Sequence, residues 1–150
     1  MRHAALALAT ALSIASTAAS NSSAAQTPRA YREGPVIVVT YVRTKPGMFD
    51  RYMQYLSTSY KADMEAEKAA GLVTDYAILR SEARTPTDHD VALTVTYKNW
   101  GALDNLADRS EPVVNRVLQS TPEQRNQQFA DRSAIREILG SRTYQQLSLK

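Results

Sequence analysis

The sequence predicts an α+β fold in which helices cover one face of an antiparallel sheet, with the elements in the order β-α-β-β-α-β. Two observations lead to this prediction. Runs of β-branched and aromatic residues alternate with segments whose apolar residues recur every three or four positions, and a turn-rich segment directly joins the two middle runs. The 150 residues, 43% of them hydrophobic, are sufficient for one domain.

Residues 1–25 are predicted to be a secretory signal peptide. A short positive start with Arg2 and His3 precedes an Ala/Leu-rich stretch, and small residues with several Ala-x-Ala-like cleavage options follow it. The alternative is a membrane anchor, but the stretch is shorter than the roughly 20 apolar residues that span a bilayer. We therefore expect an exported protein, periplasmic or extracellular, without stable membrane insertion after cleavage.

The folded domain is expected over residues 35–150. Residues 26–34 contain Pro, Gly and three charged side chains without periodicity, which is typical of a flexible lead-in. Residues 35–43 form a β-branched and aromatic run that stops at a Lys-Pro-Gly turn signal over residues 45–47. This run is predicted to be the first strand.

A long amphipathic helix is predicted after this turn. Phe49, Tyr52, Leu56, Tyr60 and others up to position 64 recur three or four residues apart and form one apolar stripe. The glycine at position 71 occupies the expected left-handed cap, and the leucine after it can fold back over the last turn. The helix is therefore predicted to end there.

The two middle strands are predicted to form a hairpin. Residues 72–83 contain spaced apolar side chains and end at a turn cluster over residues 84–88. Residues 90–98 alternate large apolar with smaller side chains, as a strand does. The second and third strands therefore follow each other directly.

A second helix is predicted to start after Asn99, which occupies an N-cap position before Trp100 and further apolar residues at helical spacing. Pro112 is expected to break or kink this helix. Thr121, followed by Pro in the first turn, predicts a new short helix that ends near Ser133.

The last strand is predicted within residues 135–149, with a bulge or break around Gly140. The complete order is that of a ferredoxin-like α+β sandwich. In the first strand, alternate residues on both faces are apolar, with Ile37, Val39 and Tyr41 on the side opposite Val36 and its neighbours. Helices can cover only one of these faces, so we expect the other to be buried in a homodimer with stacked sheets.

Four segments carry a resemblance to a known family. They are the strand and turn at 38–47, the Ala-Gly-Leu break at 70–72, the Thr-Tyr-Lys-Asn-Trp junction at 96–100 and the tail at 136–140. With these segments the sequence resembles the dimeric α/β-barrel superfamily, which includes antibiotic-biosynthesis monooxygenases, NIPSNAP-like and stress-responsive barrel proteins. The resemblance covers about residues 36–149 and looks closest to small exported members. None of the four segments is a catalytic signature, so the resemblance implies a fold rather than a reaction.

Composition and charge exclude several kinds of chemistry. The chain has no Cys and only two His, which excludes disulfides and thiolate ligands and disfavours His-based metal or haem sites. Its net charge of +3 comes from interspersed acids and bases, so no nucleic-acid partner is expected. Asp63, Glu65 and Glu67 alternate with lysines on the first helix and are interpreted as a solvated face. We expect neither a metal nor a cofactor.

Six residues are candidates for a ligand site in a cleft between helix and sheet. They are Asn99, Trp100, Tyr41, Tyr76, Tyr97 and Tyr60. Tyrosine hydroxyls that converge on such a cleft would suit a flat, partly polar molecule. The alternative for the Asn is a helix cap, for the Trp an anchor of the second helix on the sheet, and for each Tyr a hydroxyl directed to backbone or water.

The resemblance adds one further point about this site. Haem-degrading members of the superfamily use an Asn, a Trp and a haem-ligating His, and quinone-forming members use an Asn and a Trp without metal. His89 falls in the predicted hairpin loop and would be the one imidazole left after signal cleavage, so haem is not expected. Two hypotheses remain. The first is an exported homodimer that binds a small apolar or aromatic molecule without catalysis. The second is a cofactor-independent monooxygenase-like enzyme for a phenolic or quinone-type substrate.

Overall fold

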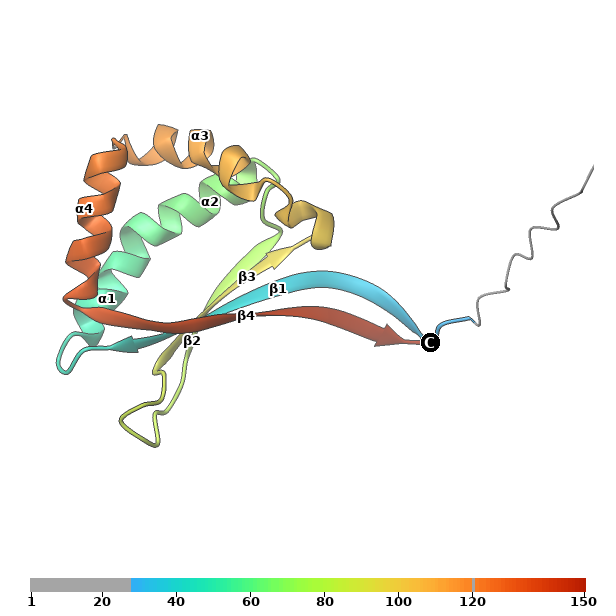
Figure 1. Ribbon diagram of the computed structural model, residues 1–150, viewed down its shortest axis with the longest axis horizontal. Coiled ribbons are helices and arrows are strands. Elements are labelled where there is room, and N and C mark those ends of the chain that lie inside the picture. The colour runs from blue at the N-terminus through green and yellow to red at the C-terminus, as the bar shows by residue number, and fades with distance from the viewer. Residues whose placement is uncertain (1–27, 120) are drawn as a thin grey trace, which may run out of the picture.

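The computed structural model describes residues 28–119 and 121–150, in which four antiparallel strands form one sheet with α-helices over one of its faces (Figure 1). The strands are β1 (Tyr31–Thr44), β2 (Asp75–Arg80), β3 (Val91–Tyr97) and β4 (Arg136–Leu149), in the spatial order β2-β3-β1-β4. This order, combined with the β-α-β-β-α-β succession, is that of a ferredoxin-like α+β fold. The predicted fold class is therefore confirmed. The predicted signal peptide, residues 1–25, lies outside the described residues.

Strand β1 begins at Tyr31, four residues before the predicted start of the domain at 35. The extension has a physical cause, because Tyr31 to Glu33 pair with Leu149 to Leu147 of β4. Both strands are 14 residues long and extend beyond the helices as a two-stranded arm (Figure 1). Part of the predicted lead-in thus belongs to the sheet.

The first helix is one rod with an irregular centre. It comprises α1 (Phe49–Tyr55), a π-helical segment η1 (Leu56–Tyr60) and α2 (Lys61–Ala69). It ends as predicted at Gly71, whose φ is +72°. The N–H of Gly71 donates to the Lys68 carbonyl at 3.0 Å and that of Leu72 to the Glu67 carbonyl at 2.9 Å. These two bonds form a Schellman motif.

The second helical region differs from the prediction. Asn99 precedes only a 3-10 turn, η2 (Trp100–Leu103), and the α-helix α3 (Leu106–Leu118) starts after Asn105, whose φ is +50°. Pro112 lies inside α3, which continues past it, so the predicted break at this residue is wrong. The chain changes direction at Asn105 instead, because a left-handed residue cannot continue a helix.

Two further predictions on the second half are confirmed. Helix α4 (Pro122–Ser133) starts with a capping box, in which Gln124 N–H donates to Thr121 Oγ1 at 3.3 Å and Thr121 N–H donates to Gln124 Oε1 at 2.9 Å. Strand β4 has a bulge between the partners of Tyr41 and Val42, next to Gly140 with φ +141°.

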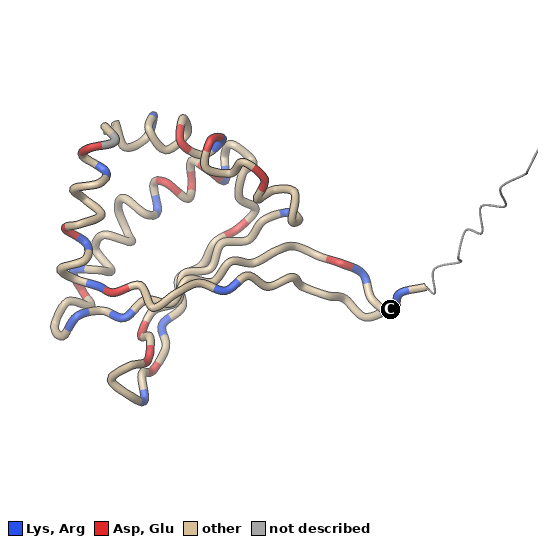
Figure 2. The backbone as a smooth tube through the Cα atoms, viewed as in Figure 1, with Lys and Arg blue, Asp and Glu red and all other residues tan. Residues whose placement is uncertain are grey.

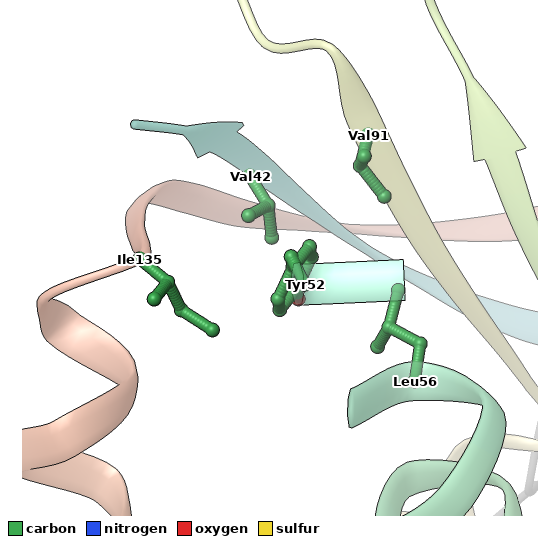
Figure 3. Close-up of a cluster of buried hydrophobic side chains, with 5 residues drawn as sticks. All are labelled: Val42, Tyr52, Leu56, Val91 and Ile135. Carbon is green, nitrogen blue, oxygen red and sulfur yellow. The ribbon is translucent and has the colours of Figure 1, made fainter. Parts of the chain in front are cut away.

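The hydrophobic core lies between the sheet and the helices. Figure 3 shows Val42, Tyr52, Leu56, Val91 and Ile135 pointing toward one another from β1, α1, η1, β3 and the residue before β4. A second buried cluster contains Val36, Val73 and Tyr97. These side chains belong to the apolar positions of the sequence pattern, and all of them point into the core between the sheet and the helices.

The other side of the sheet is not covered by any element of the described chain (Figure 1). The registers place on it the side chains of Ile37, Val39, Tyr41, Ala77, Leu79 and Tyr144. We call this set the open sheet face. This agrees with the sequence pattern, in which residues on both faces of the first strand are apolar.

Charged residues are spread over helices, loops and strand ends, with both signs interspersed (Figure 2). This matches the composition, which showed no basic run. Across residues 28–119 and 121–150, no helix combines the length and the apolar character that a membrane span requires.

Candidate functional site

The structure places three of the four candidate tyrosines on the helix side of the sheet. Tyr97 belongs to the buried cluster around Val36, and the rings of Tyr60 and Tyr76 meet edge to face with centroids 6.1 Å apart. The Tyr76 hydroxyl donates to Glu65 Oε1 at 2.7 Å. These hydroxyls therefore face helix α2 and the interior rather than one shared opening.

Tyr41 lies on the opposite side of the sheet. Its hydroxyl is 3.1 Å from that of Tyr144, and its ring centroid is 4.7 Å from that of His89. The helix side and the open sheet face cannot contribute to one cleft within a single chain, because the sheet separates them. The expected convergence of Tyr41 with the other tyrosines is therefore wrong.

Asn99 and Trp100 follow the end of β3 and line one open pocket, which none of the four candidate tyrosines lines. The Asn99 side chain accepts a hydrogen bond from the Ala102 N–H at 3.1 Å, which is the capping role weighed from the sequence. The Trp100 side chain is 49% exposed. The Trp100 side chain is therefore half-covered, and its role as an anchor of the second helix stays a prediction.

A small, partly open cavity of about 120 Å³ is lined by residues of the first helix, α3 and α4. We call it the helix cavity. Its lining residues come from three elements that are distant in sequence, namely Tyr55, Ser59 and Asp63, then Val114 and Leu118, then Arg125, Gln128 and Arg132. Apolar walls and several polar groups thus meet in one small space, as in most ligand pockets.

Two buried polar atoms in this cavity have no hydrogen-bond partner in the described part of the chain. They are Oδ1 of Asp63 and Nε of Arg132. Although both side chains line the cavity, they form none of the ion pairs found within 4 Å among residues 28–119 and 121–150. Buried polar groups are nearly always satisfied, so two such atoms in one cavity indicate room for a molecule that supplies the missing bonds.

Burial raises the pKa of Asp63 to about 6. Desolvation of the carboxylate is the main cause, the nearby Glu67 carboxylate adds to it, and the Arg132 guanidinium opposes both. Glu67 itself is buried and accepts a hydrogen bond from the Ser110 hydroxyl of α3. The interpretation of these acids as a solvated face is therefore wrong for Asp63 and Glu67.

Aromatic rings hold the Arg132 guanidinium in place. Its central carbon lies 4.8 Å from the centroid of the Tyr55 ring and 5.7 Å from that of Phe129. Arg136 is stacked in the same way, 5.8 Å from the Tyr52 ring and 5.6 Å from Phe129. Cation–π contacts of this kind fix the plane of the guanidinium without neutralising its charge.

Arg125, the second arginine at the cavity, has different surroundings. Its Nη2 forms an ion pair with Glu111 Oε1 at 3.1 Å, and its Nη1 donates to Asn115 Oδ1 on α3. This arginine therefore links α4 to α3 beside the cavity. Among the described residues, no group of three or more metal-binding side chains occurs.

The π-helical segment positions the cavity-facing side of the first helix. Ser57 and Thr58 each donate their hydroxyl to the Gln54 carbonyl at 2.9 Å, which competes with the regular backbone bonds of the helix. Segments of this type are frequent at functional sites. Tyr55, Ser59 and Asp63 lie four residues apart, so this spacing was the available signal in the sequence for the missed site.

No protein-family model matches the sequence, and no curated protein matches it. Two solved structures are similar in fold. One is HapK from Hahella chejuensis, with 13% identity, a TM-score of 0.47, and coverage of 74% of this chain and 91% of HapK. The other is a dimeric ferredoxin-like protein from an uncultured marine organism, with 6% identity, a TM-score of 0.46, and coverage of 79% of this chain and 90% of that protein.

Proposed function

We propose that the protein binds a small molecule, of about the size of one aromatic ring, in the helix cavity. The observation that carries this proposal is the pair of buried, unpartnered atoms, Asp63 Oδ1 and Arg132 Nε, in the side chains that line this one small cavity. A ligand that carries both a ring and a polar group would contact the apolar wall and satisfy these atoms.

The size of the cavity limits the ligand. A cavity of about 150 Å³ lined by apolar side chains holds benzene. The helix cavity, with about 120 Å³, is slightly smaller and is walled by the Tyr55 ring, Val114 and Leu118. A short aliphatic chain is therefore expected to fit inside, and a single ring with a polar group is expected to extend in part into the opening of the cavity. Haem and polycyclic quinones are too large for it.

Phenol is a suitable probe for this proposal, and calorimetric titration measures its binding. We expect saturable binding to the mature protein, with Val114→Phe abolishing it because the added ring fills the cavity. Val117→Phe is the matched control, since Val117 lies on the same helix but is 41% exposed and does not line the cavity. Circular dichroism confirms that both variants are folded. Unchanged phenol binding in Val114→Phe would contradict the proposal.

We also propose that the protein is exported and works as a homodimer. The exported state is supported by the pattern of residues 1–25. The homodimer is supported by the open sheet face, since an identical apolar surface on a second copy would cover it symmetrically. The oligomeric state is independent of the helix cavity, which lies on the other side of the sheet.

Binding without turnover has more support than the monooxygenase-like alternative. That reaction would require Asn99 and Trp100 to contact the substrate. Asn99 and Trp100 do line one open pocket, but the Asn99 side-chain oxygen is used as a cap. In addition, neither residue lines the helix cavity.

A further inference from the structure

We infer that the ligand of the helix cavity is a small organic carboxylate, whose negative charge binds the Arg132 guanidinium while Asp63 donates a hydrogen bond to it. This inference rests on the proposed function and adds the chemical class of the ligand. It follows from the charges around the cavity, where the Arg132 guanidinium forms none of the ion pairs found among residues 28–119 and 121–150.

The first step concerns the arginines of the core. Arg43 and Arg125 each form an ion pair, with Glu137 at 2.6 Å and Glu111 at 3.1 Å. Arg132 and Arg136 form none with any residue of the described chain, although Arg136 is buried and Arg132 is half-buried. A buried guanidinium without an anion is costly, so this position favours a negatively charged guest.

The second step concerns the geometry of Arg132. The rings of Tyr55 and Phe129 contact its guanidinium, and its Nε lies in the interior without a partner. A guanidinium presents its N–H groups in a planar fork that matches the two oxygens of a carboxylate. The Tyr55 ring, which lines the same cavity, provides an apolar surface for the remainder of such a ligand.

The third step concerns Asp63. Two carboxylates placed side by side repel each other unless one of them carries a proton. Burial and Glu67 already favour the protonated form of Asp63, in which its hydroxyl can donate to the ligand carboxylate. Binding above the pKa of Asp63 would take up one proton from solution, and no bond is made or broken in the ligand.

Inorganic phosphate fits these observations less well. A dianion with four oxygens needs several donors, whereas the one buried donor without a partner among the described residues that line this cavity is the Arg132 Nε. The lining also contains the Asp63 carboxyl group, which would repel a dianion, and the apolar side chains of Val114 and Leu118. A single carboxylate on an apolar body matches one guanidinium and one protonated acid. The test therefore compares an aromatic carboxylate with its neutral amide.

Calorimetric titration with benzoate and benzamide at about pH 5 tests this inference. We expect benzoate to bind at least about tenfold more tightly than benzamide, as one charge-assisted bidentate contact would provide. Arg132→Gln should abolish this preference. Arg116→Gln is the matched control, because Arg116 is exposed in the last turn of α3 and does not line the cavity. If Arg132→Gln does not fold, Arg132→Lys keeps the charge but lacks the planar fork, and should reduce the preference.

The pH dependence of benzoate binding tests the role of Asp63 separately from that of Arg132. Raising the pH to about 7.5 should weaken benzoate binding to the unmodified protein, while Asp63→Asn should bind benzoate equally well at both pH values because its amide is a permanent donor. Benzoate affinity that is independent of pH in the unmodified protein would overturn the role of Asp63. Equal affinity for benzoate and benzamide would overturn the inference but not the proposed function, whereas binding of neither probe nor of phenol would overturn both.

Discussion

Asp63 and Arg132 line the same cavity from two different helices, yet their charged groups form no ion pair within 4 Å. Opposite charges at such close quarters usually pair. Here the carboxyl oxygen Oδ1 and the guanidinium Nε both remain buried without partners. The arrangement costs stability in the free protein and leaves two complementary groups for a bound molecule.

The first prediction concerns the pH dependence of stability. Asp63 has a folded-state pKa of about 6, against an ordinary value of 3.8, so the folded state binds the proton more tightly than the unfolded state does. The protonated Asp63 side chain therefore contributes to the free energy of unfolding. This contribution is fully present below about pH 4 and is lost as the pH rises through about 6. Asp63→Asn, which cannot ionise, should therefore be more stable than the unmodified protein at neutral pH, by about 1 kcal/mol after solvent screening.

Urea unfolding at about pH 4 and about pH 7 measures this difference. The two proteins should have similar free energies of unfolding at the lower pH, where Asp63 is protonated. Glu67 and Arg132 act on the same carboxyl group, Arg125 lines the same cavity, and all three are present in both proteins. A variant that is less stable than the unmodified protein at neutral pH would show that the ionised carboxylate is favourably paired there.

The second prediction concerns the end of the first helix. Gly71 has a φ of +72°, and an added Cβ would meet no atom within 4 Å. Gly71→Ala should therefore cost about 1 kcal/mol through backbone strain alone. Gly101→Ala is the control, because Gly101 has no positive φ and its added Cβ would make an ordinary contact with Asn99 at 3.5 Å. Thermal unfolding should show a lower Tm for Gly71→Ala only, and an equal loss in both variants would contradict the strain argument.

The strands and the helix ends could be predicted because their signals are local. The β-branched run before position 45, the glycine at position 71 and Thr121 before a proline each act within a few residues of the chain. The break at Asn105 gave no comparable signal, since a left-handed Asn depends on the contacts that α3 makes. Pro112 removes only one backbone donor from α3, and the packing of α3 on α2 is sufficient to keep that helix continuous.

The candidate site depended on long-range packing and was largely missed. Asp63 and Glu67 have the composition of a solvated helix face, but Glu67 is buried and Asp63 half-buried, because α3 packs on α2 and residues of α4 line the cavity beside Asp63. Tyr41 illustrates the opposite case. The alternation in the first strand already placed this side chain on the face opposite Val36, so its separation from the helix side follows from the sequence pattern.

The third prediction separates the cap from a catalytic role at Asn99. The Asn99 side chain accepts from the Ala102 N–H, so Asn99→Ala should lower the free energy of unfolding by about 1 kcal/mol. Because Asn99 does not line the helix cavity, phenol binding should be unchanged. Asn99→Asp is the control, since a carboxylate oxygen can accept the same bond. Oxygen uptake with phenolic substrates that is present in the unmodified protein and lost in Asn99→Ala would instead favour the enzyme hypothesis.

The fourth prediction concerns the open sheet face and the oligomeric state. Leu79 lies on edge strand β2 and is 51% exposed in the single chain, so a homodimer with stacked sheets would cover it. Leu79→Lys should place a charge in this interface and shift the mature protein from dimer to monomer, without a loss of folding, because an edge side chain contributes little to the core.

Val117→Lys is the matched control, since Val117 is also a partly exposed aliphatic residue but lies on α3, away from the sheet. Light scattering after size-exclusion chromatography measures the mass of each variant, and circular dichroism verifies folding. The expected result is a dimer for the unmodified protein and for Val117→Lys, and a monomer for Leu79→Lys. An unmodified protein that is monomeric at micromolar concentration would contradict the homodimer. A Leu79→Lys variant that remains dimeric would place the interface elsewhere, because burial of a lysine between two stacked sheets is costly.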